Sequence, residues 1–183
     1  MKKFVLSLLF CFLTLPLVVL AQEEAEGPIL SGEMKSYSDE TNAFSVKVPV
    51  EFKDPTTPGS PVLTFEGPAY RGGALSFHVN TVNMPSIESS TMFGINKAQT
   101  QKDPFYTGVK EVKVPGGMGY VFKEIDTERD GSAKAADSIH RWHLAAFGNG
   151  RYYNCVFGGS FSSFDDPVVT GAFENIIKSF QIK

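Results

Sequence analysis

The chain has 183 residues, of which 17 are basic and 20 acidic, and its formal net charge at pH 7 is −3. This length is sufficient for one domain with a substantial hydrophobic core. The mildly acidic balance disfavours nucleic acid and anionic membrane surfaces as partners, because both attract basic proteins.

The first 21 residues have the pattern of a secretory signal peptide. A basic pair, Lys2 and Lys3, precedes an almost wholly apolar stretch at 4–20, and Val19 and Ala21 suit the −3 and −1 positions of a cleavage site. The apolar stretch is also near the lower length limit of a membrane span, so a retained anchor is the alternative. The pattern favours cleavage, and therefore a periplasmic or secreted protein without stable membrane insertion.

The two cysteines are typical of an exported protein that has no disulfide. Phe10, rather than a small residue, precedes Cys11, and largely apolar residues follow it, so we do not expect a lipoprotein. Cleavage after Ala21 would leave Cys155 as the single cysteine, so the core must stabilise the fold unaided. Cleavage would also remove two basic residues and no acidic residue, which would change the net charge from −3 to −5.

The region after the cleavage site divides into a lead-in and a domain. Residues 22–36 are polar and acidic, and we interpret them as a flexible tether; residues 37–183 then form a single domain. Residues 43–49 alternate apolar and polar side chains and end at a proline, which predicts a half-buried strand.

Further strands are predicted by the same kind of pattern. In the strand at 74–83, Leu75 and Phe77 share one face with the later apolar positions, and His78 lies on the other face. We therefore interpret His78 as a solvated or hydrogen-bonded strand residue rather than a ligand. The other strands are predicted at 62–65, 109–114 and 119–128, with turns at 70–73 and 115–117.

Two helices are predicted. The first, at 85–101, places Ile87, Thr91, Ile95 and Ala98 on one side at helical spacing. The second opens at Asp166-Pro167, where aspartate can cap the helix and proline suits its first turn. Its apolar stripe, which we expect to lie on the sheet, consists of Val168, Val169, Ala172, Phe173, Ile176 and Ile177. A short closing strand with Phe180 and Ile182 is expected to follow.

Residues 139–159 hold two of the three histidines, the single tryptophan and Cys155. Asn149-Gly150 lies between two apolar runs, which is the strongest short-range signal for a β-hairpin. With these two residues as the loop, the cross-strand partners are Trp142 with Phe157, His143 with Val156, Leu144 with Cys155, and Ala146 with Tyr153. The face with Trp142 and Cys155 is expected in the core, and the face with His143 is expected to lie partly under a helix.

This hairpin argues against a metal or nucleophile site. His140 and His143 are three apart on a strand, so they point to opposite faces and cannot bind one ion together. Cys155 lies in an apolar setting, whereas a reactive thiolate needs a polar or cationic one. His140 is too far along the ladder to pair with Cys155.

The row Glu124, Asp126, Glu128 and Asp130 places four carboxylates on one face of a strand. A calcium site is the alternative interpretation. We favour a solvated strand end, because an extended strand spaces alternate side chains about 6.5–7 Å apart. The chain also has no hydrolase, zinc-protease or phosphate-loop motif. We therefore predict no catalytic residue, no cofactor-binding residue, no metal ligand and no cofactor.

The chain has 16 phenylalanines, of which three lie in the first 21 residues. Most of the others must be in the core. A groove left between helix and sheet could accept a hydrophobic ligand.

Two segments resemble a known family. Residues 37–52, YSDETNAFSVKVPVEF, resemble the first strand of PsbP-like domains, and residues 173–183, FENIIKSFQIK, resemble their closing helix and Ser-Phe ending. DcrB-like bacterial envelope proteins have a similar layout. The resemblance, over about residues 36–183, implies an α+β fold in which an antiparallel sheet is flanked by helices as an α/β/α sandwich. It also implies a largely non-enzymatic family, and no functional motif matches from which site residues could be carried over.

These observations rank three hypotheses for function. The first is an exported, non-catalytic accessory protein that binds another envelope or secreted protein. The second is a carrier of a small hydrophobic ligand. The third is an enzyme, and a pocket that joins His78 or His143 to nearby acids would raise its rank.

Overall fold

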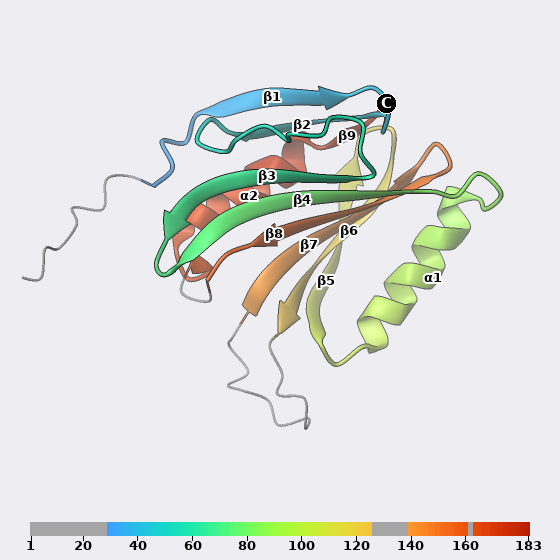
Figure 1. Ribbon diagram of the computed structural model, residues 1–183. Helices are drawn as coiled ribbons and strands as arrows, with labels where there is room; N and C mark the ends of the chain where they lie inside the picture. Colours follow the sequence, from blue (N-terminus) through green and yellow to red (C-terminus); the bar gives the residue numbers. More distant parts are fainter. Residues whose placement is uncertain (1–28, 126–138, 161–162) are drawn as a thin grey trace, which may run out of the picture.

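The computed structural model describes residues 29–125, 139–160 and 163–183 (Figure 1). Within these ranges no helix is long and apolar enough to cross a membrane. In chain order the elements are β1 (Met34–Asp39), β2 (Phe44–Pro49), β3 (Val62–Tyr70), β4 (Gly73–Asn83), α1 (Ser89–Lys102), β5 (Tyr106–Val114), β6 (Gly117–Ile125), β7 (Ile139–Gly148), β8 (Arg151–Gly158), α2 (Pro167–Ser179) and β9 (Gln181–Ile182).

The strands form two antiparallel sheets. The large sheet has the order β3-β4-β8-β7-β6-β5, and the small sheet has the order β1-β2-β9. α1 covers part of one face of the large sheet, while α2 and the small sheet lie on the other (Figure 1). The predicted α+β fold with an antiparallel sheet flanked by helices is confirmed. The separate small sheet was not predicted, because β9 pairs with β2 across most of the chain length.

The main core lies between the large sheet, α2 and the small sheet. On β4, the predicted face with Leu75, Phe77 and Val79 is fully buried in it. This alternation confirms the strand prediction, since every second side chain of a strand points to the same face. The hairpin β7–β8 supplies the centre of the sheet.

The prediction for the apolar side of the first helix, α1, is wrong, because this side does not face the sheet. Ile87 and Ile95 are 44% and 48% exposed, whereas Met92 and Phe93 pack against the sheet. The Phe93 ring makes edge contacts with Tyr120 at 5.8 Å and with Phe147 at 5.9 Å. A phenylalanine ring has more apolar surface to bury than an isoleucine side chain, so Phe93 determines which side of the helix faces inward.

α2 begins as predicted. The Asp166 carboxylate accepts a hydrogen bond from the Val168 backbone N–H at 2.8 Å, and Pro167 is the first helical residue. Four residues of the predicted stripe are buried, and Ile177 is half-buried. Val168 is the exception: it is 55% exposed, because it lies at the margin of the apolar stripe, whereas Val169 in the same turn is buried.

The domain begins earlier than residue 37. Leu30 is buried in the main core, and β1 starts at Met34. The second half of the predicted tether is therefore part of the fold, because one apolar side chain and the pairing of β1 with β2 hold it there. Residues 1–28, including the predicted signal peptide, lie outside the described ranges.

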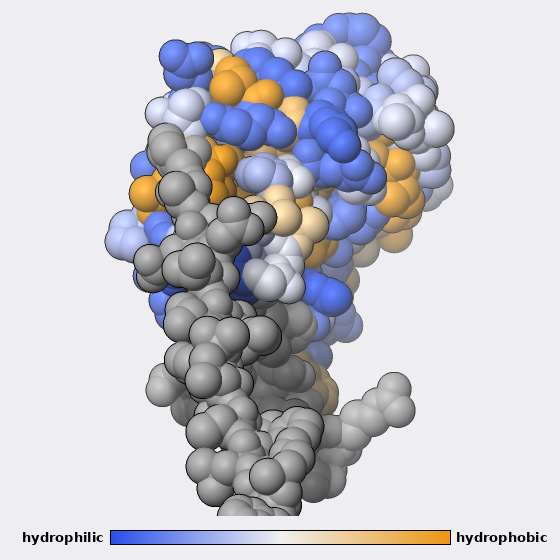
Figure 2. Space-filling view, turned by 60° about the vertical axis from the view of Figure 1, so that its left-hand side comes forward, coloured by the Kyte–Doolittle hydropathy of each residue, from blue (hydrophilic) through white to orange (hydrophobic). Residues whose placement is uncertain are grey.

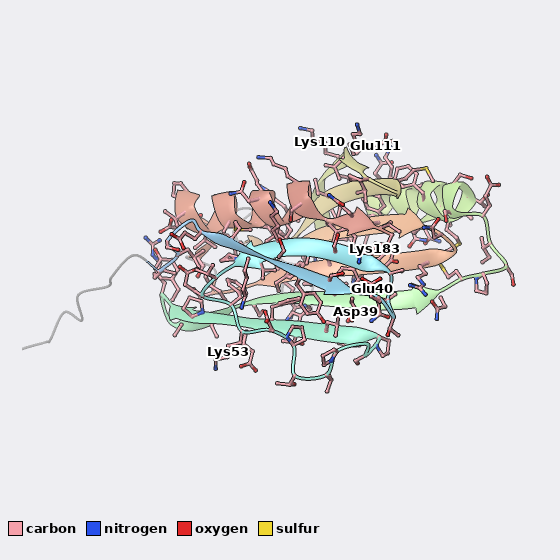
Figure 3. The ribbon with its side chains drawn as sticks, turned by 90° about the horizontal axis from the view of Figure 1, so that it is seen from above. Asp39, Glu40, Lys53, Lys110, Glu111 and Lys183 are labelled. Atoms are coloured by element: carbon pink, nitrogen blue, oxygen red, sulfur yellow. The ribbon has the colours of Figure 1, made fainter. Side chains whose placement is uncertain are left out.

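A cluster of three aromatic side chains connects the two sheets. The Phe44 ring stacks on Phe180 at 5.4 Å, and Tyr153 makes edge contacts with Phe180 at 5.6 Å and with Phe44 at 6.0 Å. All three side chains are fully buried. The Tyr153 hydroxyl donates to the backbone carbonyl of Asn42 at 2.8 Å. Nearby, the backbone N–H of Lys183 donates to the Ala43 carbonyl, and its Nζ contacts Glu40, as Figure 3 shows from above.

We predict that Tyr153→Phe lowers the free energy of unfolding by about 1–2 kcal/mol, because it leaves a buried carbonyl without its donor while keeping the ring. Urea unfolding followed by circular dichroism measures this loss. Tyr106→Phe is the control, since no hydrogen bond of that hydroxyl is found among the described residues and its removal should change stability by less than about 0.5 kcal/mol. An equal effect of the two substitutions would contradict the role of the Tyr153 hydroxyl.

Candidate functional site

The large apolar side chains that are exposed on the described surface are distributed along the chain from Val50 to Val168. Figure 2 shows one face of the molecule. On the described part of this face, apolar side chains lie in small areas separated by hydrophilic ones. Scattered apolar residues of this kind are normal for a protein surface. A groove is therefore a more specific candidate.

The candidate site is a groove of about 860 Å³ between α2 and strands β5, β6 and β7. Its apolar floor combines residues from each of these elements. A volume in this range is typical of sites that bind small molecules. The floor consists of Val112, Val121, Trp142, Phe173 and Ile177.

Local structure explains why these side chains meet. Val121 and Trp142 lie on the face of the large sheet that carries the main core. Phe173 and Ile177 are one turn apart on the same side of α2. The Trp142 ring packs against Phe173 at 5.1 Å between ring centroids. The core thus continues into an apolar surface that α2 leaves partly uncovered.

Lysines line the groove around this floor. Lys110 and Lys113 come from β5, Lys123 from β6 and Lys178 from the last turn of α2. Lys123 Nζ lies 4.4 Å from the centroid of the Trp142 ring, which is a cation–π contact. The chemistry of the groove is therefore apolar at its base and cationic at its edge.

The other face of the large sheet has a polar hollow of about 450 Å³. Its walls include His78, Ser76 and Arg141, and Gly158 forms part of its base. His78 is hydrogen-bonded to Thr64 Oγ1 at 3.0 Å and to Ser76 Oγ at 3.1 Å, which confirms its predicted character. Burial, followed by the charge of Arg141, lowers the pKa of His78, so its ring is neutral at neutral pH.

His143 lies near this hollow but is itself buried. Its Nε2 is 3.0 Å from a Glu124 carboxylate oxygen, and its ring stacks on Phe122 at 4.5 Å. Both His143 and His78 pair with Val156, so one strand separates them by about 10 Å. Burial lowers the pKa of His143, although the contact with Glu124 opposes this shift. His143 is thus joined to an acid, but it does not line the hollow and is only 6% exposed, so this contact does not raise the rank of the enzyme hypothesis.

The hairpin prediction is confirmed residue by residue. Trp142 pairs with Phe157, His143 with Val156, Leu144 with Cys155, and Ala146 with Tyr153. Cys155 is buried, as predicted, and α1 covers part of the other face.

Other predicted features lie outside the described residues. They include the side chain of His140 and three of the four carboxylates in the acidic row, Asp126, Glu128 and Asp130. The fourth, Glu124, contacts His143 and lies 3.6 Å from Arg141. Within the described ranges there is no group of side chains suited to hold a metal ion.

Sequence reasoning missed the lysines of the groove. They are distributed over residues 110–178 and show no spacing that would group them. The one available signal was the general expectation of a groove between helix and sheet.

The fold is an α+β arrangement of antiparallel sheets with two helices. No family model matches the chain, and no curated protein matches it. Among solved structures, the solution structure of cyanobacterial PsbP (CyanoP) from Synechocystis sp. PCC 6803 is similar. The TM-score is 0.48 and the sequence identity 16%, over 90% of this chain and 99% of that chain. This neighbour is a PsbP, the family that residues 37–52 and 173–183 resemble.

We predict that Cys155 reacts slowly with a thiol reagent such as Ellman's reagent in the native protein, since burial in an apolar core raises the pKa of its thiol. A chain that starts at residue 22 has no other cysteine, so the absorbance reports this side chain alone. Full reaction in guanidinium chloride is the control. Rapid native labelling at neutral pH would contradict the buried position.

We also predict that acid destabilises the fold through its histidines. Because the pKa of His143 is lower in the folded than in the unfolded chain, stability is complete above about pH 6.5 and falls as pH decreases below this value. The Tm of the parent protein should therefore be lower at about pH 5.5 than at about pH 7.5. His143→Gln should reduce this difference, although it lowers the Tm at both pH values. An equal difference in parent and variant would contradict the prediction.

Proposed function

We propose that the chain is a non-catalytic binding protein that holds an apolar ligand in the groove between α2 and β5–β7. The observation that carries this proposal is a hollow of about 860 Å³ whose base is aliphatic and aromatic. Removing such a surface from water is favourable, so an apolar ligand that displaces water from the groove gains binding free energy.

The residues around the groove support a binding role. Among the described lining residues, none has a hydroxyl, thiol or imidazole group that could serve as nucleophile or general base. The two described histidines lie on the opposite face of the large sheet. The two described histidines are thus separated from the groove.

We propose as the place of action the periplasm or the extracellular medium. The support is the pattern of the first 21 residues: a basic pair, an apolar stretch and small residues at the cleavage positions.

A second proposal is an accessory protein that binds another polypeptide. It is favoured by the position of β5, which is an edge strand of the large sheet and borders the groove, so a partner's strand could add to it. However, β5 has a bulge between Thr107 and Lys110 and is rich in charge, both of which oppose strand addition. We therefore place the small ligand first.

The single tryptophan makes the proposal directly testable, because Trp142 lies in the groove. Titration with decanol, a neutral apolar probe, should change its fluorescence in a saturable way. Ile177→Asn should weaken binding about tenfold, because it places an amide on the apolar floor. The matched control is Ile95→Asn, which makes the same change on the exposed side of α1 and should leave binding unchanged.

Native mass spectra of the protein from its source would separate the two proposals. A small added mass would support the carrier. A second polypeptide in fixed ratio, together with no change of Trp142 fluorescence on addition of decanol, would contradict the carrier and support the accessory protein.

A further inference from the structure

The charge around the groove differs in sign from the charge of the whole chain. The lining contains four lysines and one acidic residue, Glu174, whereas the chain has a net charge of −3. Positive charge is therefore concentrated at this site against an acidic background. Such a concentration raises the local population of anions.

The lysines of the groove also differ in their partners. Elsewhere on the described surface, Lys35, Lys53 and Lys97 each form an ion pair with a carboxylate. Among the described residues, neither Lys110 nor Lys123 has such a pair. Within the described ranges, therefore, no carboxylate competes with an external anion for these two ammonium groups.

The groove lysine on α2 is only weakly engaged. Lys178 lies 3.3 Å from Glu174 one turn away on α2, and both side chains are exposed. Ion pairs of this kind contribute little, so Lys178 can turn to a ligand at small cost.

Trp142, a lining residue of the groove, has an unsatisfied polar atom. The indole Nε1 of Trp142 is buried and has no hydrogen-bond partner in the part of the chain that the structure describes. A buried donor without an acceptor is destabilising, and a ligand oxygen that reaches this donor would remove the cost.

We infer that the ligand is an anionic amphiphile: an apolar chain that ends in a carboxylate or phosphate group. This inference rests on the proposed function and specifies its ligand class. The chain covers the apolar floor, while Lys110, Lys123 and Lys178 surround the headgroup. A free inorganic anion would leave the floor exposed to water, and a neutral chain would bring no negative charge to the lysines.

The test compares ligands that share a chain length and differ in charge. Titrations followed by Trp142 fluorescence use decanoate, decyl phosphate, decanol, decyltrimethylammonium, and acetate and inorganic phosphate without a chain. We expect decanoate or decyl phosphate to bind about tenfold more tightly than decanol, and added salt to reduce this preference because it screens exposed charges. Acetate and inorganic phosphate should cause no saturable change.

Charge variants connect the preference to the groove. The double substitution Lys110→Gln with Lys178→Gln should weaken decanoate binding more than decanol binding, and so abolish most of the preference for decanoate. It also leaves the Lys123–Trp142 contact intact, so the fluorescent reporter is preserved. Lys53→Gln is the control: it removes one positive charge from an exposed site on the opposite side of the molecule, and should leave the preference for decanoate unchanged (Figure 3).

The outcomes separate the two claims. Equal affinity for decanoate, decyl phosphate and decanol would overturn the anionic headgroup and keep the apolar groove. A preference for decyltrimethylammonium would also overturn the anionic headgroup, because the groove would then favour a cation. Binding of neither decanol nor the charged chains would refute the proposed function and this inference with it.

Discussion

The packing of Tyr153 against Phe44 and Phe180 is the contact on which the arrangement of layers depends. These rings come from β8, β2 and the end of α2, so one buried cluster joins both sheets and a helix. The Tyr153 hydroxyl adds a hydrogen bond to the chain just before β2. The described residues contain no disulfide that joins the sheets, so the shape of these rings sets the distance between them.

The groove is a consequence of that contact. α2 packs closely on β2, and its end is held by the pairing of β9 with the same strand. A helix held against one neighbour cannot also cover the far edge of a six-stranded sheet, so the apolar side chains of β5, β6 and Trp142 remain partly uncovered. The lysines of these elements then surround a surface that would otherwise favour aggregation.

The two faces of the large sheet have different chemistry. One continues the core into an apolar groove with cations at its edge. The other carries α1 over an aromatic cluster, and beyond α1 it carries hydrogen-bonded polar side chains around two neutral histidines. On this second face the acid next to His143 stabilises a buried ring that has little access to solvent. The groove and the two histidines, whose protonation affects the stability of the fold, thus lie on opposite faces of the large sheet.

The sequence by itself determined the features that depend on neighbouring residues. Asn149-Gly150 set the register of β7–β8, Asp166-Pro167 set the start of α2, and alternation set the buried face of β4. Each of these depends on backbone geometry and period, which act over a few residues. Only the tertiary structure decided which side of α1 faces inward, that β9 joins β2, and that Lys110, Lys123 and Lys178 surround one groove. These outcomes depend on competition between distant side chains for the same buried surface, and no local pattern records that competition.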